Sequence, residues 1–169
     1  MRRSSTKQVI MNRRQTFLLL SFSALASASP LKTALAEAFE ISKTPEEWRA
    51  LLSPEQYAVL RDEDTERPWT SPLNDEHRKG TFACAACDLP LYDAASKFDS
   101  GTGWPSFFDV LPNAVGRKED NGLFTTRTEV HCRRCGGHLG HVFDDGPPPT
   151  GLRYCMNGVA LTFHADMAA

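Results

Sequence analysis

The pattern of apolar and polar positions changes in character near residue 68. Before this point, Thr44 and Ser53 each open a capping box with proline at the first helical position, and a short apolar face follows each box. The pattern predicts two helices, over 45–52 and 54–62. Helices of this length are unstable alone, so both are expected to pack on the rest of the domain.

Beyond residue 68, brief strand-like runs alternate with turn residues. The run from Phe124 to Val130 alternates well enough for a half-buried strand. Short strands at this spacing are typical of small antiparallel sheets, so the predicted fold is mainly β with short N-terminal helices. The runs with strand character are 80–83, 89–92, 106–110, 124–131, 140–143, 152–156 and 159–163.

The first 36 residues have the order of a secretory signal. A positive start from Met11 to Arg14 precedes a short apolar run over 17–26 and an A-x-A site at 34–36. The apolar run is shorter than the roughly 20 residues that span a bilayer. The paired arginines at positions 13 and 14 resemble a twin-arginine signal, and an ordinary signal that happens to contain such a pair is the alternative.

The expected organisation is therefore an N-terminal extension and signal over 1–36, with Met11 as an alternative start, and a mature domain over 37–169. Such a signal predicts export, in a bacterium to the periplasm. The mature form is expected to be a monomer without a membrane span.

The mature domain is expected to be acidic. The 169-residue chain has 19 basic and 21 acidic residues, and the segment 1–36 contains six of the basic residues and none of the acidic ones. The formal net charge of 37–169 is therefore −8, which argues against nucleic acid or an anionic membrane as a partner.

Four of the five cysteines form two C-x-x-C pairs, Cys84 with Cys87 and Cys132 with Cys135. Two intervening residues let both sulfurs of a pair face one point, and four thiolates complete a tetrahedral shell that suits zinc or iron. A closed shell leaves no position for water, so we expect one structural zinc ion that contributes to folding. Two disulfides are the alternative, since an exported protein meets an oxidising compartment.

The fifth cysteine, Cys155, lies between Arg153 and Asn157. Residues two apart on a strand share a face, so both neighbours are expected to flank the sulfur. A nearby guanidinium favours the reactive thiolate, which makes Cys155 a candidate nucleophile. The alternative is a buried structural cysteine, which is common in protein cores.

Two further signals accompany this cysteine. His138 and His141 are three residues apart and are suited to proton transfer, although metal binding and a purely structural role remain open for them. Trp104 directly follows a tight bend formed by Gly101, Thr102 and Gly103, so it is either a presented aromatic or a core residue.

Three segments together carry a resemblance to a known family. The stretches 98–107, 132–143 and 153–157 resemble a B-type peptide-methionine (R)-S-oxide reductase with a SelR-like domain, and the match runs from about residue 40 to 164. The resemblance implies two small antiparallel sheets of the Mss4-like or β-tent type, with short N-terminal helices and zinc on the two cysteine pairs. It also implies reduction of the R epimer of methionine sulfoxide, free or within proteins and peptides, to methionine.

The same resemblance implies roles for individual residues. Cys155 would attack the sulfoxide sulfur and become a sulfenic acid. His138 and His141 would lie beside the sulfoxide oxygen, one of them as proton donor. Asn157 and Arg153 would orient the site and help to hold the thiolate.

The aromatic and the bend complete the implied site. Trp104 would form the apolar wall that receives the methyl group of the substrate. Thr102 stands where many relatives have a resolving cysteine, and the chain has no sixth cysteine to replace it. We therefore expect an external thiol, supplied by a thioredoxin-like protein, to reduce the sulfenic acid.

Two readings from other classes compete with this one. A non-catalytic zinc ribbon that binds a protein partner would explain the cysteine pairs, but it leaves the Arg153-x-Cys155-x-Asn157 motif and the histidines unexplained. A zinc enzyme that acts on a thiol adduct would need an open position on the metal, which four cysteine ligands do not leave.

Overall fold

Two proline-initiated helices open the described part of the chain. The computed structural model describes residues 39–121 and 125–167, which belong to the compact unit Glu37–Ala169. The signal predicted within 1–36 lies outside these residues. No helix of the described ranges has the length and apolarity that a membrane crossing requires.

Helices α1 (Pro45–Leu51) and α2 (Pro54–Asp62) each begin with the capping box that the sequence predicts. The Thr44 hydroxyl accepts the N–H of Glu47, and the Glu47 carboxylate accepts the N–H of Thr44 at 2.8 Å. Helix α1 ends one residue earlier than predicted, because Leu52 takes an extended conformation on entering the second capping box. The side chains that pack inward are Trp48, Leu52, Val59 and Leu60.

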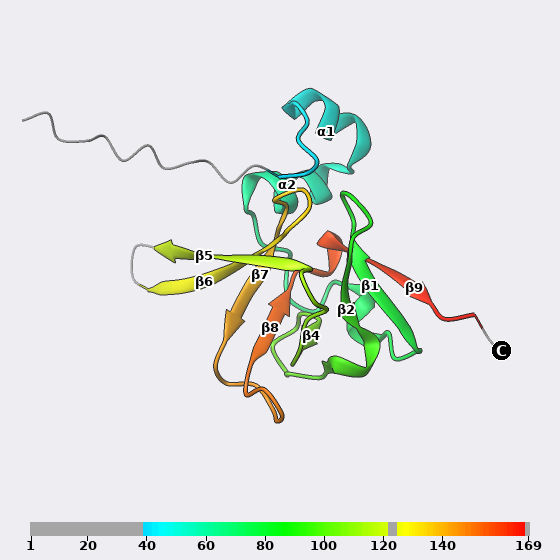
Figure 1. Ribbon diagram of the computed structural model, residues 1–169, viewed down its shortest axis with the longest axis vertical. Coiled ribbons are helices and arrows are strands. Elements are labelled where there is room, and N and C mark those ends of the chain that lie inside the picture. Colours follow the sequence, from blue (N-terminus) through cyan, green and yellow to red (C-terminus); the bar gives the residue numbers. More distant parts are fainter. Residues whose placement is uncertain (1–38, 122–124, 168–169) are drawn as a thin grey trace, which may run out of the picture. The chain divides into compact units, whose positions relative to one another are not determined.

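The strands form two antiparallel sheets, which confirms the predicted fold class (Figure 1). The first sheet has the order β2-β1-β9, with β1 at Gly80–Cys84, β2 at Pro90–Asp93 and β9 at Leu161–Ala165. The second has the order β3-β4-β8-β7-β6-β5. Its strands are β3 (Lys97–Phe98), β4 (Ser106–Phe107), β5 (Val115–Asn121), β6 (Thr126–Cys132), β7 (His138–Phe143) and β8 (Arg153–Met156).

Three short 3-10 turns lie in the connections of the described residues: η1 (Pro72–Asp75) between α2 and β1, η2 (Ala94–Ser96) between β2 and β3, and η3 (Gly158–Ala160) between β8 and β9. The strand predicted over 159–163 starts later than expected. The chain forms the turn η3 up to Ala160, and β9 starts at Leu161. The run 106–110 also shortens to two residues, since the Phe108 N–H turns away to donate to the Ser96 carbonyl.

Strand β5 is absent from the predicted runs. Its sequence is polar, its side chains are mostly exposed, and it lies at the edge of the second sheet beside β6. An edge strand that buries little apolar surface has no alternating pattern for the sequence to display.

An aromatic cluster joins the two sheets. Phe82 and Tyr92 from the first sheet meet Phe107 from the second, with ring centroids 4.9 Å and 4.3 Å away. All three rings are fully buried, as is Tyr154 on β8. Burying such rings contributes about 1.5–3 kcal/mol each, so the cluster is a principal source of cohesion between the sheets.

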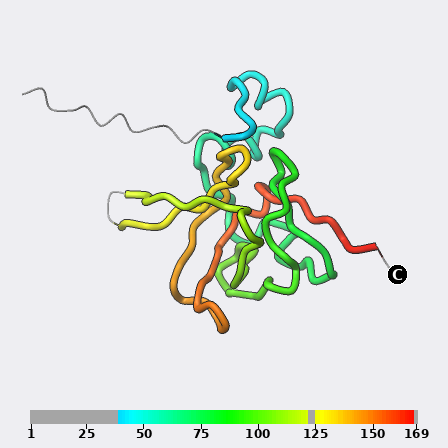
Figure 2. The backbone as a smooth tube through the Cα atoms, in the orientation of Figure 1, coloured from blue at the N-terminus to red at the C-terminus, as the bar shows by residue number. Residues whose placement is uncertain are grey.

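The loops between strands bring two remote segments together. The β1–β2 loop and the β6–β7 loop approach each other at the end of the molecule where the helices lie (Figure 2). These two loops carry the C-x-x-C pairs.

Replacing the second helix cap should weaken the fold without touching the sheets. In Ser53→Ala the Gln56 N–H loses the hydroxyl acceptor that lies 3.1 Å away, so the free energy of unfolding should fall by about 1 kcal/mol. Chemical denaturation followed by circular dichroism measures the change. Ser53→Asn keeps a side-chain oxygen at the cap and should remain near wild type; an alanine variant as stable as wild type would contradict the contribution of the cap.

Candidate active site and metal centre

The two C-x-x-C loops have the same backbone turn. The carbonyl of Cys84 accepts the N–H of Asp88, and the carbonyl of Cys132 accepts the N–H of Gly136, each at 2.8 Å. Asp88 and Gly136 both take the left-handed conformation, with φ of 57° and 66°. This turn points both sulfurs of a pair to the same side of the loop.

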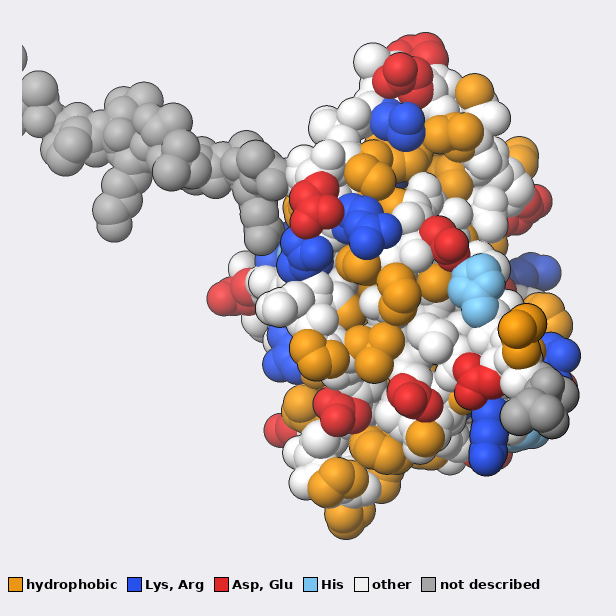
Figure 3. Space-filling view, turned by 45° about the vertical axis from the view of Figure 1, so that its right-hand side comes forward, with side chains coloured by type: hydrophobic (Ala, Val, Ile, Leu, Met, Phe, Trp, Pro, Cys, Tyr) orange, Lys and Arg blue, Asp and Glu red, His pale blue; other side chains and the backbone are white. Residues whose placement is uncertain are grey.

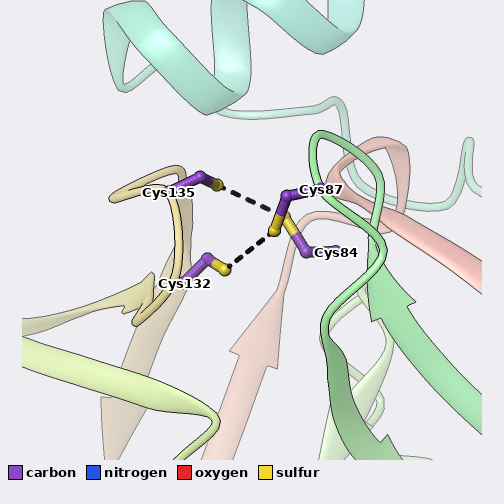
Figure 4. Close-up of side chains that lie close together, drawn as sticks. All are labelled: Cys84, Cys87, Cys132 and Cys135. Carbon is purple, nitrogen blue, oxygen red and sulfur yellow. Dashed lines mark hydrogen bonds between the residues drawn. The ribbon is translucent and has the colours of Figure 1, made fainter. Parts of the chain in front are cut away.

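The four sulfurs converge on one point (Figure 4). They all lie within 4.8 Å of one another, and the cross-loop separations are 3.7 Å for Cys84–Cys135 and 3.5 Å for Cys87–Cys132. Sulfurs bound to a tetrahedral zinc ion at 2.3 Å are about 3.8 Å apart, whereas a disulfide bond is about 2.05 Å long. The arrangement therefore fits a metal ion, as predicted, and gives no support to disulfides.

Helix α2 supplies a contact that the sequence pattern did not reveal. The Arg61 guanidinium lies over the Trp48 ring at 4.7 Å and donates to the Cys135 carbonyl at 3.1 Å. Its Nη2 is also 4.0 Å from the Cys135 sulfur. A fixed positive charge beside a cluster of thiolates offsets part of their mutual repulsion, so the helices brace the metal centre.

Cys155 lies in the middle of the second sheet. Strand β8 pairs it with Ser106 of β4 on one side and with His141 of β7 on the other. Along β8, Arg153 and Cys155 are partly exposed, whereas Tyr154 and Met156 are buried. The alternation confirms that Arg153 and the thiol share a face.

A cleft of about 110 Å³ opens over this thiol. Four of the predicted site residues line it: Cys155, His141, Asn157 and Trp104. The same cleft is lined by Thr65, Arg127, Gly140 and Phe143, which the sequence patterns did not single out. The Cys155 sulfur is therefore reachable and lies beside the tryptophan and one histidine, unlike a cysteine enclosed in the core.

The cleft has an apolar wall and a fixed amide. The indole Nε1 of Trp104 donates to the Glu66 carbonyl at 2.9 Å. The Asn157 amide accepts from the Glu66 N–H at 2.9 Å and donates to the Leu139 carbonyl at 3.1 Å. Both side chains are thus held by backbone groups, and Asn157 has a defined orientation.

Arg153 lies next to the cleft. Its guanidinium makes two 2.8 Å bonds to Asp145 and lies over the Phe143 ring at 4.4 Å. The bond to Asp145 is the main cause that raises the pKa of Arg153, and the charge of the Cys155 thiolate adds to it. Arg153 therefore remains a cation close to the thiol.

The two histidines occupy different positions. His141 lines the cleft, and its Nε2 lies 2.7 Å from Asp120, which in turn binds Arg127 at 2.8 Å. Burial lowers the pKa of His141 below its ordinary value, and the bond to Asp120 opposes that shift. The bond to His141 is also the main reason that the pKa of Asp120 is lowered.

His138 lies behind His141 as seen from the cleft. Its ring is 5.5 Å from that of His141 and is buried, and its Nδ1 is 2.8 Å from the buried carboxylate of Glu129. Burial raises the pKa of Glu129, but hydrogen bonds from His131, His138 and Lys118 outweigh it and leave the carboxylate ionised. The structure therefore brings only one of the two histidines directly into the cleft.

Thr102 also reaches the thiol. Its hydroxyl lies 3.7 Å from the Cys155 sulfur and forms a chain of hydrogen bonds with Ser100, at 2.8 Å, and through it with Ser106, at 2.7 Å. A side chain at position 102 is therefore within range of the nucleophile, as a resolving cysteine would have to be.

The chain is similar in sequence to known proteins. The SelR domain model matches residues 52–165. Peptide methionine sulfoxide reductase MsrB of Leifsonia xyli subsp. xyli is 56% identical over 130 residues, which cover 76% of this chain and 94% of that protein. The protein of the same name from Pseudomonas putida is 57% identical over 125 residues, or 73% and 94% of the two chains.

Among solved structures, a Mis18 "Yippee-like" domain superposes with a TM-score of 0.44 and 17% identity, and it covers 54% of this chain and 100% of its own. This likeness is too slight to bear on function.

Fold and site together define a protein of two small antiparallel sheets, with a four-cysteine cluster that could hold a metal ion and a reachable thiol in a separate cleft. More particularly, the chain belongs to the SelR domain family. The family and these relatives support methionine sulfoxide reduction, an oxidoreductase activity, for this chain.

Single cysteine substitutions should show that metal binding and the Cys155 thiol are independent of each other. Cys135→Ser should lose the bound metal and much of the stability, because metal binding by the four thiolates is coupled to folding. Cys155→Ser should keep the metal, since its sulfur lies in the cleft. Metal analysis of the purified variants, with thermal denaturation, measures both effects; equal metal loss in the two variants would refute the division.

Proposed function

We propose that the protein reduces the R epimer of methionine sulfoxide to methionine, mainly in oxidised proteins and peptides, with Cys155 as nucleophile. The observation that carries the proposal is the cleft that joins the Cys155 thiol to His141, Asn157 and Trp104. A sulfoxide needs a thiolate at sulfur and an acid at oxygen, and this cleft offers both within one small space.

The reductive step balances without a further reagent. The Cys155 thiolate attacks the sulfoxide sulfur and forms a transient S–S bond while the oxygen takes a proton. The hydroxyl then passes to the cysteine sulfur, and the S–O and S–S bonds to the substrate break, which returns an electron pair to the methionine sulfur. The products are methionine and a sulfenic acid on Cys155, so the substrate is reduced by two electrons and the thiol is oxidised by two. The ring of Trp104 gives the methyl group an apolar surface.

His141 is the proton donor of this proposal. It lines the cleft, whereas His138 lies one layer behind and positions it. Asp120 keeps a proton on Nε2, because an ionised carboxylate 2.7 Å away can only accept, so the proton given to the sulfoxide comes from Nδ1 of the imidazolium. Asn157 fixes the substrate beside the thiol, and Arg153 supplies positive charge next to it.

Regeneration requires a separate thiol. Thr102 is placed where a second cysteine would reach Cys155, and a hydroxyl cannot form a disulfide. The remaining cysteines are those of the metal centre. Two thiols of a thioredoxin-like protein would therefore reduce the sulfenic acid, release water and form their own disulfide.

Zinc is the proposed metal. Four thiolates at these separations suit its tetrahedral geometry, and a closed shell gives the ion a structural role, separate from the chemistry at Cys155. The metal centre and the thiol lie on different loops and strands.

We also propose that the enzyme is exported, to the periplasm in a bacterium, and acts as a monomer. The charge balance supports proteins, not nucleic acids, as its partners: acidic, basic and apolar side chains are interspersed on the face shown in Figure 3. Export would place the activity where methionines are exposed to oxidants.

The decisive experiment uses separated R and S sulfoxides. Wild type with a dithiol reductant should reduce the R epimer, and Cys155→Ser should lose more than about 10³-fold of the rate because Cys155 is the only thiol among the described residues that line the cleft. After one turnover without reductant, the intact mass should rise by one oxygen atom. Equal reduction by the serine variant would end the proposal, and an intramolecular disulfide would refute the regeneration scheme.

The acid role of His141 predicts a pH effect. Asp120 opposes the lowering of the His141 pKa, so Asp120→Asn should lower that pKa further. A rate that depends on the imidazolium rises as pH falls through its pKa, and the variant should therefore show this rise at lower pH. The pH profile of the reductive step measures the shift.

The control for this experiment is Asp144→Asn, which removes an exposed carboxylate three residues along the chain from His141. Its profile should match that of wild type. An unchanged or upward-shifted profile for Asp120→Asn would contradict proton donation by His141.

A further inference from the structure

Glu66 contacts two walls of the cleft through its backbone. Its N–H donates to the Asn157 side chain at 2.9 Å, and its carbonyl accepts from the Trp104 indole at 2.9 Å. One residue, in the loop between α2 and η1, therefore sets both the amide and the aromatic ring.

The carboxylate of Glu66 makes a third attachment. Its Oε2 accepts the N–H of Gly158 at 2.6 Å and that of Val159 at 3.2 Å. These two groups open the 3-10 turn that directly follows Asn157. A carboxylate that accepts two backbone N–H groups makes charge-assisted bonds, which are about twice as strong as neutral ones.

The turn that receives this carboxylate is closely packed against its neighbours. A side chain at Gly158 would collide with the Ser71 hydroxyl, and Asn157 itself is buried and bonded to the Leu139 carbonyl. The turn is thus a firm anchor for the loop that carries Glu66.

The loop itself needs such an anchor. Its residues 63–70 are largely exposed and form no helix or strand, and the other backbone bonds that hold it lie near its ends, from Asp64 to Ala58 and from Trp69 to Gly103. Between these ends, the Glu66 carboxylate adds the bonds to Gly158 and Val159, which attach this part of the loop to the turn after Asn157.

We infer that Glu66 is a positioning residue, whose carboxylate holds the loop so that its peptide groups aim Asn157 and Trp104 at the substrate. The inference rests on the proposed function. Glu66 does not line the cleft with Cys155, although its neighbour Thr65 does, so it acts through these two side chains and not on the sulfoxide.

The test compares three variants in the reductive step. Glu66→Ala should lower kcat by about 10- to 100-fold, because a displacement of about 1 Å in a site costs rate on this scale. Glu66→Gln keeps an oxygen that can accept both N–H groups and should recover most of the rate. Arg67→Ala removes the next, exposed side chain of the same loop and should behave as wild type.

A second measurement reports on position without catalysis. The indole N–H of Trp104, assigned with Trp104→Phe, should exchange with solvent about tenfold faster in Glu66→Ala, because its acceptor is no longer fixed. The buried Trp48 serves as internal reference and should not change. Metal content and the rate of Cys155 alkylation should equal those of wild type.

The inference is overturned by unchanged kcat and indole exchange in Glu66→Ala, or by a glutamine variant as impaired as the alanine variant. Loss of metal or accelerated exchange at Trp48 in Glu66→Ala would also overturn it, since that would show general unfolding. If wild type reduces no sulfoxide, the proposed function fails, whereas the indole exchange still decides whether Glu66 holds Trp104.

Discussion

The convergence of four sulfurs is the constraint on which the rest of the structure depends. It joins the loop after β1 to the loop after β6, segments 45 to 51 residues apart, and so ties the first sheet to the second. Without a metal ion, four thiols at this distance would attract one another only weakly. A metal ion held by these four cysteines would therefore supply part of the stability that a larger hydrophobic core supplies in bigger domains.

The four-cysteine cluster also constrains the cleft, because strand β7 follows it directly along the chain. Strand β7 starts at His138, only two glycines after Cys135, so the metal centre fixes where this strand begins. Gly140 allows β8 to lie close, since a side chain there would collide with the Cys155 carbonyl. The position of His141 opposite Cys155 thus follows from the metal centre and one close backbone approach.

Local signals in the sequence were enough to predict the helices, the cysteine pairs and most strands. Capping boxes and C-x-x-C spacing act over a few residues, so the chain displays them directly. The motif resemblance also found Cys155, His141, Asn157 and Trp104, which the cleft brings together. Glu66 escaped detection because its role arises from contacts with residues 38 to 93 positions away, which no local pattern encodes.

Strand β5 shows most clearly why some of the fold and of the candidate site could not be predicted from the sequence. It is polar because its side chains face solvent or other charges, and those charges support the histidines: Asp120 binds His141, and Lys118 binds Glu129, the partner of His138. A polar stretch of this kind is typical of a loop when it is considered alone. Only pairing with β6 turns it into a strand, and only that pairing places its carboxylate beside the cleft. The charged residues that contact these histidines therefore lie in the segment with the weakest folding signal, because charged residues erase the apolar alternation by which strands are recognised.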